Sequence, residues 1–420
     1  MKGWPSRPRS RSRGRHDAAA GRTTTHRMNQ KPVPKTSGSC PTCGASRFAL
    51  ARFCPGCGSP VPQEAAGLQP GPLRLATSFS LAQTPRFPLQ VWRGHLVVVG
   101  HRGRIQVFVE GQIEPVLQEE VSLEGDLASP PVFLEGLLAV PGPQAIQIHD
   151  LASRLSGRSF EPPRTQGLPL GGTLVSAVVT DGRRWLAAPV NVGNQAEVRL
   201  WESCPRRGFV PHSSFRPGGV APGQSLHAWL VGQSLYAGAE GGALSGLDLA
   251  TRQTLRTLQV SGSLKASPVV RDGAVPLIRS ADDALFRLPA SPEHSLQFVF
   301  QDAGQSLWTW AEDSTAWWVA AGGHLYRGTP QAGGQVRLAL RDSSALCPAP
   351  VPGGAFVLDR GGWLTAVSFH EGRLEHIGQQ RLFEGSIGHS AAPIVLGQTL
   401  YAVDSEGSLG AWRALEGGTR

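Results

Sequence analysis

The sequence predicts an all-β fold, and three observations carry this prediction. Gly and Pro are abundant, with 52 and 34 copies in 420 residues, whereas charged residues make up only 17%. Short strands separated by tight turns produce this balance, and long helices do not. A weak repeat with a period of roughly 40 to 50 residues also recurs along residues 73–420. Strand repeats of this length predict the blades of a closed β-propeller, because one blade cannot bury both of its faces.

Two copies of the repeat are the clearest. One lies within residues 267–286 and the other within residues 392–412. Each contains a short apolar strand, a polar turn, a second strand, a Gly-bearing turn and a third strand. We predict eight such blades, with seven as the alternative count. The fourth strands are the least distinct, as expected for half-exposed outermost strands.

Aligning the copies gives the expected inner three strands of each blade. First strands are expected at residues 88–92, 130–134, 174–180, 225–231, 267–271, 306–311, 348–352 and 391–396. Second strands are expected at residues 96–100, 137–140, 185–190, 235–238, 275–279, 316–321, 355–359 and 400–404. Third strands are expected at residues 104–109, 145–149, 196–201, 243–248, 284–288, 324–328, 363–368 and 408–413.

Residues 73–81 form a predicted strand that precedes the first blade and has no earlier strand to pair with. They align with residues 381–387, the outer strand before the last blade. The last blade itself ends after its third strand. We therefore predict that residues 73–81 complete the last blade and close the ring, because this pairing covers a sheet edge that would otherwise be exposed.

Residues 1–39 form a polar, basic tail that we expect to be disordered. Residues 1–35 contain ten Lys or Arg residues and one acid, so the remaining chain carries 30 basic and 30 acidic residues. The alternating arginines of residues 7–15 are typical of a segment that binds nucleic acid, and a solvated tail is the alternative. Met28 is an alternative start that would remove most of this charge. Any nucleic-acid role would rest on the tail rather than on the body of the protein.

Four of the six cysteines fall in two Cys-x-x-Cys-Gly turns, and they are Cys40, Cys43, Cys54 and Cys57. Each turn can direct two thiolates at one ion, with the Gly supplying a positive φ. Four thiolates in tetrahedral geometry favour Zn²⁺, with iron as the lesser alternative. We expect one structural Zn²⁺ per chain and no catalytic metal, because four cysteines leave no open position. The other two cysteines are isolated, which indicates a reducing compartment rather than a disulfide framework.

Residues 40–58 resemble the small bacterial zinc-ribbon family. That family has two Cys-Pro-x-Cys-Gly knuckles with a Phe just before the second, and Phe53 matches this pattern. The resemblance implies a structural zinc ribbon. A redox dithiol is the alternative, but the surrounding βαβ pattern is missing. Residues 59–72 contain four prolines and predict a semi-rigid Pro/Gly linker with few contacts to either neighbour.

The repeat of residues 73–420 resembles the PQQ-like, or quinoprotein-type, β-propeller repeat. Residues 235–251 are the closest copy. Arg252 replaces the Gly of the family's Thr-Gly pair, and the Trp that docks one blade on the next is absent at Leu255. Other tryptophans lie in predicted strands, where we expect packing between blades rather than ligand stacking. They are Trp92, Trp229, Trp308, Trp310, Trp317, Trp318, Trp363 and Trp412.

For the quinone-dependent enzymes of this fold, the resemblance implies periplasmic export, adjacent cysteines near the quinone and a Ca²⁺ site. The chain shows no apolar signal segment, no adjacent cysteines and no evident carboxylate cluster. We therefore do not expect PQQ as a cofactor, and we assign no catalytic or cofactor-binding residue. The isolated His149, His227 and His389 are interpreted as structural groups.

Residues 201–224 are the longest interruption of the repeat. They carry Cys204, three arginines and His212. One interpretation is a binding loop on a rigid ring. We favour the other, an outer strand too divergent to recognise.

These observations favour a non-enzymatic protein-interaction scaffold. The propeller would be a rigid binding platform and the ribbon a second contact module, joined by a linker that permits multivalent attachment. We expect a cytoplasmic bacterial protein with a monomeric propeller and protein partners. No apolar run is long enough to span a membrane as a helix. The alternatives are a nucleic-acid-associated protein that binds through ribbon and tail, and a PQQ-dependent dehydrogenase.

Overall fold

The structure is a computed structural model that describes residues 36–39, 46–48 and 68–415 with short gaps. The gaps are residues 111, 113, 122, 124, 157–165, 205–207, 222–223, 240, 261–263, 266–276, 281–283, 289–294, 302–307, 313–315, 330–334, 386 and 389–391. The chain divides into two compact units, residues 1–59 and residues 60–420. In the described part, no helix has both the length and the apolar character needed to cross a membrane.

In the first unit, β1 (Thr36–Ser39) pairs antiparallel with β2 (Ser46–Phe48). The four cysteines of the predicted zinc site, Cys40, Cys43, Cys54 and Cys57, lie outside the described residues. The metal site and the ribbon therefore stay predictions.

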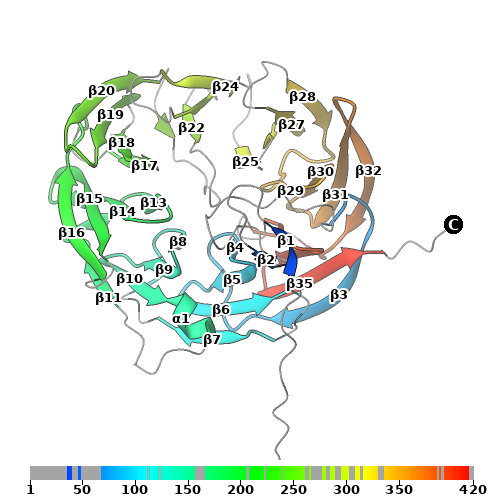
Figure 1. Cartoon of the computed structure of the whole chain (residues 1–420). Coiled ribbons are helices and arrows are strands. Elements are labelled where there is room, and N and C mark those ends of the chain that lie inside the picture. Colours follow the sequence, from blue (N-terminus) through cyan, green and yellow to red (C-terminus); the bar gives the residue numbers. More distant parts are fainter. Residues whose placement is uncertain are drawn as a thin grey trace, which may run out of the picture. The chain divides into compact units, whose positions relative to one another are not determined.

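In the second unit, the described strands form eight antiparallel sheets arranged in a ring, seven of four strands and one of five (Figure 1). The first sheet contains β4 (Gln90–Trp92), β5 (His95–Val99), β6 (Arg104–Val109) and β7 (Leu117–Glu120). The second contains β8 (Val132–Leu134), β9 (Leu137–Pro141), β10 (Ala145–Asp150) and β11 (Gln166–Pro169). The third contains β12 (Thr173–Leu174), β13 (Val179–Thr180), β14 (Trp185–Val192), β15 (Gln195–Cys204) and β16 (Gly208–Phe215). The fourth contains β17 (His227–Val231), β18 (Ser234–Gly238), β19 (Ala243–Asp248) and β20 (Thr254–Gln259).

The remaining four sheets continue the ring in chain order. The fifth contains β21 (Leu264–Lys265), β22 (Leu277–Ser280), β23 (Ala284–Arg287) and β24 (Gln297–Gln301). The sixth contains β25 (Trp308–Glu312), β26 (Trp317–Ala321), β27 (His324–Gly328) and β28 (Gln335–Ala339). The seventh contains β29 (Ala349–Val351), β30 (Gly354–Leu358), β31 (Trp363–His370) and β32 (Arg373–Arg381). The last contains β3 (Leu73–Ser80), β33 (Ile394–Leu396), β34 (Thr399–Val403) and β35 (Ser408–Ala414).

The all-β prediction is confirmed, and most predicted strands overlap an observed one. The predicted third strands at 104–109, 243–248 and 324–328 coincide with β6, β19 and β27. The predicted strand at 174–180 is instead two short strands, β12 and β13, which both pair with β14. The predicted strand at 267–271 lies outside the described residues, and β21 is the described partner of β22 in that sheet. The sequence analysis missed the short helix α1 (Leu151–Ser156), which begins where the Asp150 carboxylate accepts hydrogen bonds from Ser153.

The predicted ring closure is confirmed. The last sheet has the strand order β3-β35-β34-β33, so its outer strand comes from the beginning of the second unit. The pairing of β3 with β35 is antiparallel and runs from Leu73 opposite Ala414 to Ser80 opposite Ser408. The backbone N–H of Leu81 also donates to the carbonyl of Gly407 at 2.9 Å. We call the boundary between the last sheet and the first sheet the seam.

Apolar side chains pack between neighbouring sheets around the ring. Between the first and second sheets, Trp92 stacks on Phe133 with ring centroids 5.9 Å apart. The prediction that tryptophans pack between sheets holds for Trp92, Trp229, Trp317, Trp318 and Trp412, which are all buried. Burial of such large rings removes much apolar area from water and is a main stabilising contribution to the ring.

Five of the eight outermost strands contain a register irregularity that the sequence pattern hid, whereas β7, β11 and β28 pair without one. The pairing register shifts in β3, β16, β20, β24 and β32. In four of them a single extra residue is left unpaired, and these residues are Ala76, His212, Val299 and Ile377. A bulge breaks the two-residue alternation of a strand. This explains why the fourth strands were the weakest in the sequence.

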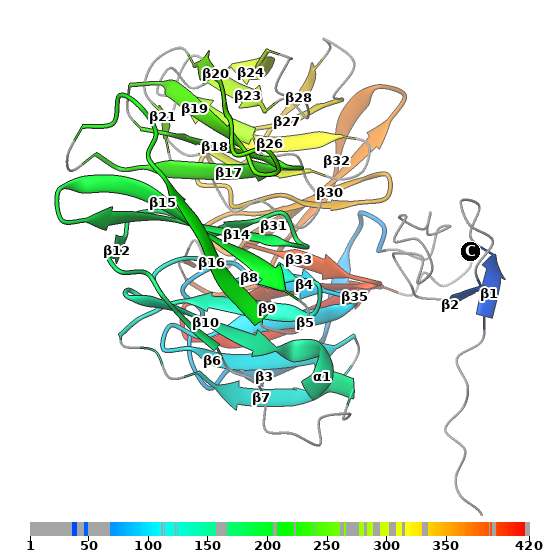
Figure 2. The ribbon, with the colours of Figure 1, turned by 60° about the vertical axis from the view of Figure 1, so that its left-hand side comes forward.

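Residues 201–224 include an outer strand, as the favoured interpretation predicted. β15 continues to Cys204, and β16 returns antiparallel along it from Gly208 to Phe215 (Figure 2). Much of this segment is therefore sheet rather than the alternative of a binding loop. The end of the predicted linker also differs from expectation. Leu68 is buried in the core of the last sheet, and its N–H donates to Gly397 O at 3.1 Å.

Candidate functional site

The described part of the chain contains no metal centre. Within the described ranges, no group of three or more His, Cys, Asp or Glu side chains is placed to hold a metal ion. Cys204 at the end of β15 and Cys347 before β29 are half-buried. These two cysteines belong to different sheets, the third and the seventh.

The buried histidines are packed as parts of the sheets. His149 on β10 is 6% exposed, and burial, followed by the nearby Arg154 guanidinium, lowers its pKa. His149 is therefore neutral near pH 7, as a buried imidazole without a carboxylate partner should be. His227 on β17 lies beside Trp229 with ring centroids 6.1 Å apart. His389 lies outside the described residues.

A polar cluster joins the third and fourth sheets at the bulge of β16. The imidazole of His212, the unpaired residue of this bulge, meets the Trp185 ring edge to face, with ring centroids 4.8 Å apart. Its Nε2 accepts a hydrogen bond from the Arg252 guanidinium at 3.2 Å, since arginine can only donate. Burial comes first in lowering the pKa of His212, and Arg252 and Arg184 lower it further, whereas Glu202 opposes them.

Arg252 explains one departure from the resembled repeat. Its φ is +60°, so it adopts the left-handed conformation that the family's Gly would take at this turn. The turn is held by the Asp248 carboxylate, which accepts hydrogen bonds from Ala250 N at 2.9 Å and Thr251 N at 2.7 Å. These hydrogen bonds lower the pKa of Asp248, with the bond from Thr251 N–H the largest cause.

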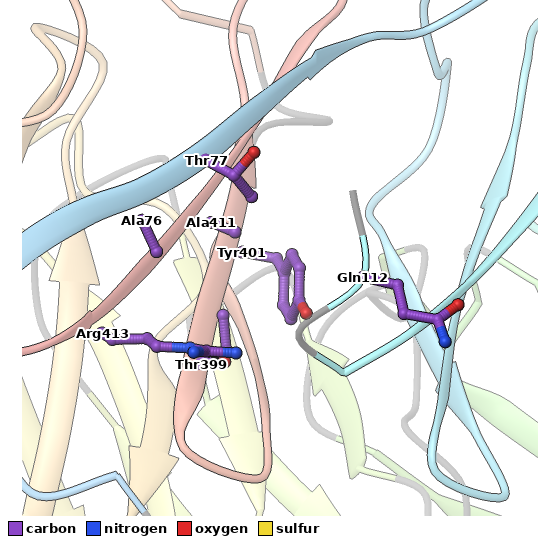
Figure 3. A pocket seen from close by; sticks show the side chains of 7 residues that line it. All are labelled: Ala76, Thr77, Gln112, Thr399, Tyr401, Ala411 and Arg413. Carbon is purple, nitrogen blue, oxygen red and sulfur yellow. Dashed lines mark hydrogen bonds between the residues drawn. The ribbon is translucent and has the colours of Figure 1, made fainter. Parts of the chain in front are cut away.

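A pocket of about 140 Å³ lies at the seam (Figure 3). We call it the seam pocket. Its lining comes from β3, β34 and β35 of the last sheet and from the segment after β6 of the first sheet. The lining residues are Ala76, Thr77, Gln112, Thr399, Tyr401, Ala411 and Arg413.

The register of the last sheet brings its paired lining residues to one face of that sheet. Across β3, β35 and β34, Arg74 lies opposite Arg413, which in turn lies opposite Thr399. In the next row, Ala411 lies between Thr77 and Tyr401. Because directly opposed residues share a face of a sheet, the small Ala411 leaves space between larger neighbours.

Glu110, which follows β6 of the first sheet, contacts the last sheet across the seam. Its Oε1 accepts a hydrogen bond from Gln398 N at 2.6 Å and lies 3.5 Å from Thr399 Oγ1. The turn that presents Gln398 contains Gly397, whose φ is +59°. A Cβ added at this glycine would collide with the Glu110 carboxylate. Glycine is needed here both for its backbone conformation and for the close approach of Glu110.

Arg413 carries the only charge among the seven lining residues. Its Nε donates to Thr399 Oγ1 at 3.3 Å, which orients the guanidinium. The lining contains no thiol, imidazole or carboxylate, so it lacks a general base or a metal ligand. Its chemistry is that of anion recognition through a guanidinium and neighbouring hydroxyl and amide groups. The sequence analysis missed this pocket because its residues come from segments around 76, 112 and 399–413, and only the predicted ring closure hinted at their meeting.

Comparisons with known proteins show the fold. Neither a family model nor a curated protein sequence matches the chain. Among solved structures, Sqt1 of Saccharomyces cerevisiae is similar, with a TM-score of 0.56 and 10% identity, over 83% of this chain and 99% of that chain. The computationally designed protein Ika8 is similar with a TM-score of 0.55 and 12% identity, over 80% of this chain and 99% of that chain. The structural neighbours are WD40-like β-propellers, and the resemblance to the PQQ-like repeat finds no family model to support it.

Proposed function

We propose that this protein is a non-enzymatic protein-interaction scaffold whose β-propeller is a rigid binding platform. The observation that carries the proposal is the closed ring, in which β3 and β35 pair along their lengths and apolar clusters fill the spaces between sheets. Turns attached to such a ring keep fixed relative positions, which is what a binding platform requires. The β-propeller fold of the structural neighbours supports the same role.

We further propose that the eight sheets are eight blades of a single propeller. The eight antiparallel sheets described in chain order, and the closure of the last by β3, support this count. A ring of repeated sheets leaves few exposed edges, so it favours a monomeric platform.

The zinc ribbon is the second module of the proposed scaffold. Cys40, Cys43, Cys54 and Cys57 would hold one structural Zn²⁺, because two Cys-x-x-Cys-Gly turns supply four thiolates. Full-length protein should contain one zinc per chain by plasma mass spectrometry. The Cys43→Ser, Cys54→Ser double variant should contain none, whereas Cys204→Ser should keep its zinc. Zinc retained in the double variant would contradict this assignment.

We propose that the protein works in the bacterial cytoplasm, because the cysteine spacing, with four clustered and two isolated, is typical of a metal site rather than of a disulfide framework. There the ribbon and the propeller would contact partners together. Two linked contacts give a higher apparent affinity than either contact alone.

The test is a crosslinking capture with the tagged full chain in its own cells, compared with the zinc-site double variant. We expect the same specific proteins to be captured by both chains, with a lower yield for the variant because one contact is lost. Crosslinked nucleic acid in place of protein, lost when the chain starts at Met28, would replace the scaffold by the nucleic-acid-associated alternative. Failure to capture any specific protein would contradict the proposal.

A further inference from the structure

We propose that the seam pocket binds a carboxylate side chain from an acidic segment of the partner protein. This inference rests on the proposed scaffold function and names a site and a partner chemistry for it. It is carried by the charge, the orientation and the size of the pocket.

The charge of the pocket is a single oriented guanidinium. The Nε of Arg413 is bonded to Thr399 Oγ1 at 3.3 Å. Among the described residues, the terminal guanidinium nitrogens of Arg413 have no hydrogen-bond or ion-pair partner. Two parallel N–H groups match the two oxygens of a carboxylate, which makes this the preferred partner of an oriented arginine.

The surroundings of Arg413 favour an added negative charge. Arg74 lies directly opposite Arg413 on the paired strand. Two guanidinium groups therefore lie on the same face of the sheet, and their positive charge attracts anions to it. The nearby Glu110 carboxylate already accepts the hydrogen bond of Gln398 N at 2.6 Å, across the seam.

The size of the pocket selects a side chain over a coenzyme. Sites for small-molecule substrates and cofactors usually have volumes of roughly 300 to 1,000 Å³. The seam pocket has about 140 Å³, which is space for one carboxylate side chain. Thr77 and Gln112 line it with a hydroxyl and an amide group that can bond the remaining carboxylate lone pairs.

Binding there would also stabilise the ring. The lining joins β3, the segment after β6 and the two strands β34 and β35, so a ligand would contact the chain on both sides of the seam. A ligand that binds only the closed ring raises the unfolding temperature as its concentration rises.

The experiment measures the fluorescence anisotropy of a fluorescein-labelled hexaglutamate peptide at low ionic strength, with hexaglutamine as the neutral probe. The full chain is compared with Arg413→Gln, Arg413→Lys and Ala76→Leu, which fills the pocket from its rim without a change of charge. Arg373→Gln on β32 is the matched control for loss of one exposed arginine.

We expect wild type to prefer hexaglutamate over hexaglutamine. Arg413→Gln should weaken hexaglutamate binding by about tenfold or more, as loss of a charged hydrogen-bond partner does. Arg413→Lys and Ala76→Leu should weaken it to a smaller extent, and Arg373→Gln should leave it near the wild-type value. Thermal unfolding of each variant, with and without hexaglutamate, establishes that the ring is folded and shows whether the peptide stabilises it.

Equal hexaglutamate affinity of folded wild type and Arg413→Gln would overturn the inference. The same holds if Arg413→Gln and Arg373→Gln lose affinity equally while Arg413→Lys and Ala76→Leu keep it, since that would indicate attraction to overall charge. The cellular crosslinking then separates the two proposals. If Arg413→Gln still captures the wild-type partners, the pocket assignment fails while the scaffold stands, and if wild type captures none, the scaffold fails.

Discussion

The seam and the boundary between the third and fourth sheets, which we call the junction, differ in how far apart along the chain the contacting segments are. At the junction, the two sheets are consecutive in the chain, and β16 and β17 are separated only by residues 216–226. At the seam, Glu110 bonds to Gln398, a residue 288 positions away. The junction contains the left-handed turn at Arg252, whereas the seam places Gly397 where a Cβ would meet the Glu110 carboxylate. A contact between distant segments has a higher chain-entropy cost, so the seam depends more than the junction on the side-chain and backbone contacts that hold it closed.

Of the changes considered, deletion of β3 is expected to destabilise the seam most. We expect a chain lacking residues 73–80 to lose more than about 4 kcal/mol of unfolding free energy, because β35 loses its ladder partner and the buried Leu73 leaves the core. Urea denaturation followed by tryptophan fluorescence measures the loss. A chain starting at Met28 is the control and should unfold like the full chain. Equal stability of the two shortened chains would show that β3 does not hold the ring closed.

Two glycines with the same backbone conformation sharpen the comparison. Gly397 and Gly232 have φ values of +59° and +58° and both lie in the turn between the first and second strands of a sheet. A Cβ at Gly232 would meet nothing within 4 Å, whereas at Gly397 it would displace the Glu110 carboxylate.

Both Gly→Ala variants should lose about 1 kcal/mol from backbone strain. Gly397→Ala should lose about 1 kcal/mol more, because the charged hydrogen bond of Glu110 to Gln398 N breaks on a partly exposed surface. Urea denaturation of both variants gives the difference. If Glu110→Gln reduces the stability of the wild type and of Gly397→Ala by the same amount, the explanation through Glu110 is wrong.

Acid should loosen the junction before it loosens the seam. The pKa of His212 is lowered in the folded protein, by burial first and then by Arg252, with Arg184 adding to this and Glu202 opposing it. The unfolded chain therefore takes up the proton more readily, and stability at the junction falls as the pH falls below about 6.5. The effect is small, since His212 is only partly buried and solvent screens much of its interaction with the charged neighbours.

Hydrogen-exchange protection factors at pH 7.5 and 5.5 measure this effect strand by strand. We expect the protection of β16 amides to decrease at pH 5.5 more than that of β3 amides, because no histidine lines the seam pocket. His212→Asn should remove most of the difference. A difference that persists in this variant would assign the acid sensitivity to another group.

The smallest expected effect is a gain. Arg252→Gly should relieve the left-handed strain at the junction and increase the unfolding free energy by up to about 1 kcal/mol. The lost hydrogen bond to His212 offsets part of this gain. Urea denaturation measures the net value, and Arg252→Ala, which keeps the strain but loses the bond, should be less stable than wild type. A gain in both variants would show that the guanidinium, and not the backbone, is unfavourable.

The sequence predicted features that depend on local pattern. Apolar alternation marked β6, β19 and β27 with their observed bounds, and the unpaired segment at 73–81 predicted the closure by β3. The outer strands escaped because bulges at residues such as His212 and Ile377 interrupt the alternation. The seam pocket escaped because Gln112, Thr399 and Arg413 meet only through the folded ring, and no spacing in the sequence encodes that meeting.

The pairing of β3 with β35 also makes ring closure depend on the synthesis of β35. β3 is made early, yet its partner ends at Ala414, so it has to wait while more than three hundred residues emerge from the ribosome. During that time its backbone N–H and C=O groups that pair with β35, and the Leu73 side chain that is buried in the closed ring, lack their native contacts. An interrupted chain therefore keeps an unpaired strand that chaperones and proteases can recognise, and only a chain synthesised through β35 can cover it. Ring closure thus distinguishes chains that include β35 from chains that stop before it.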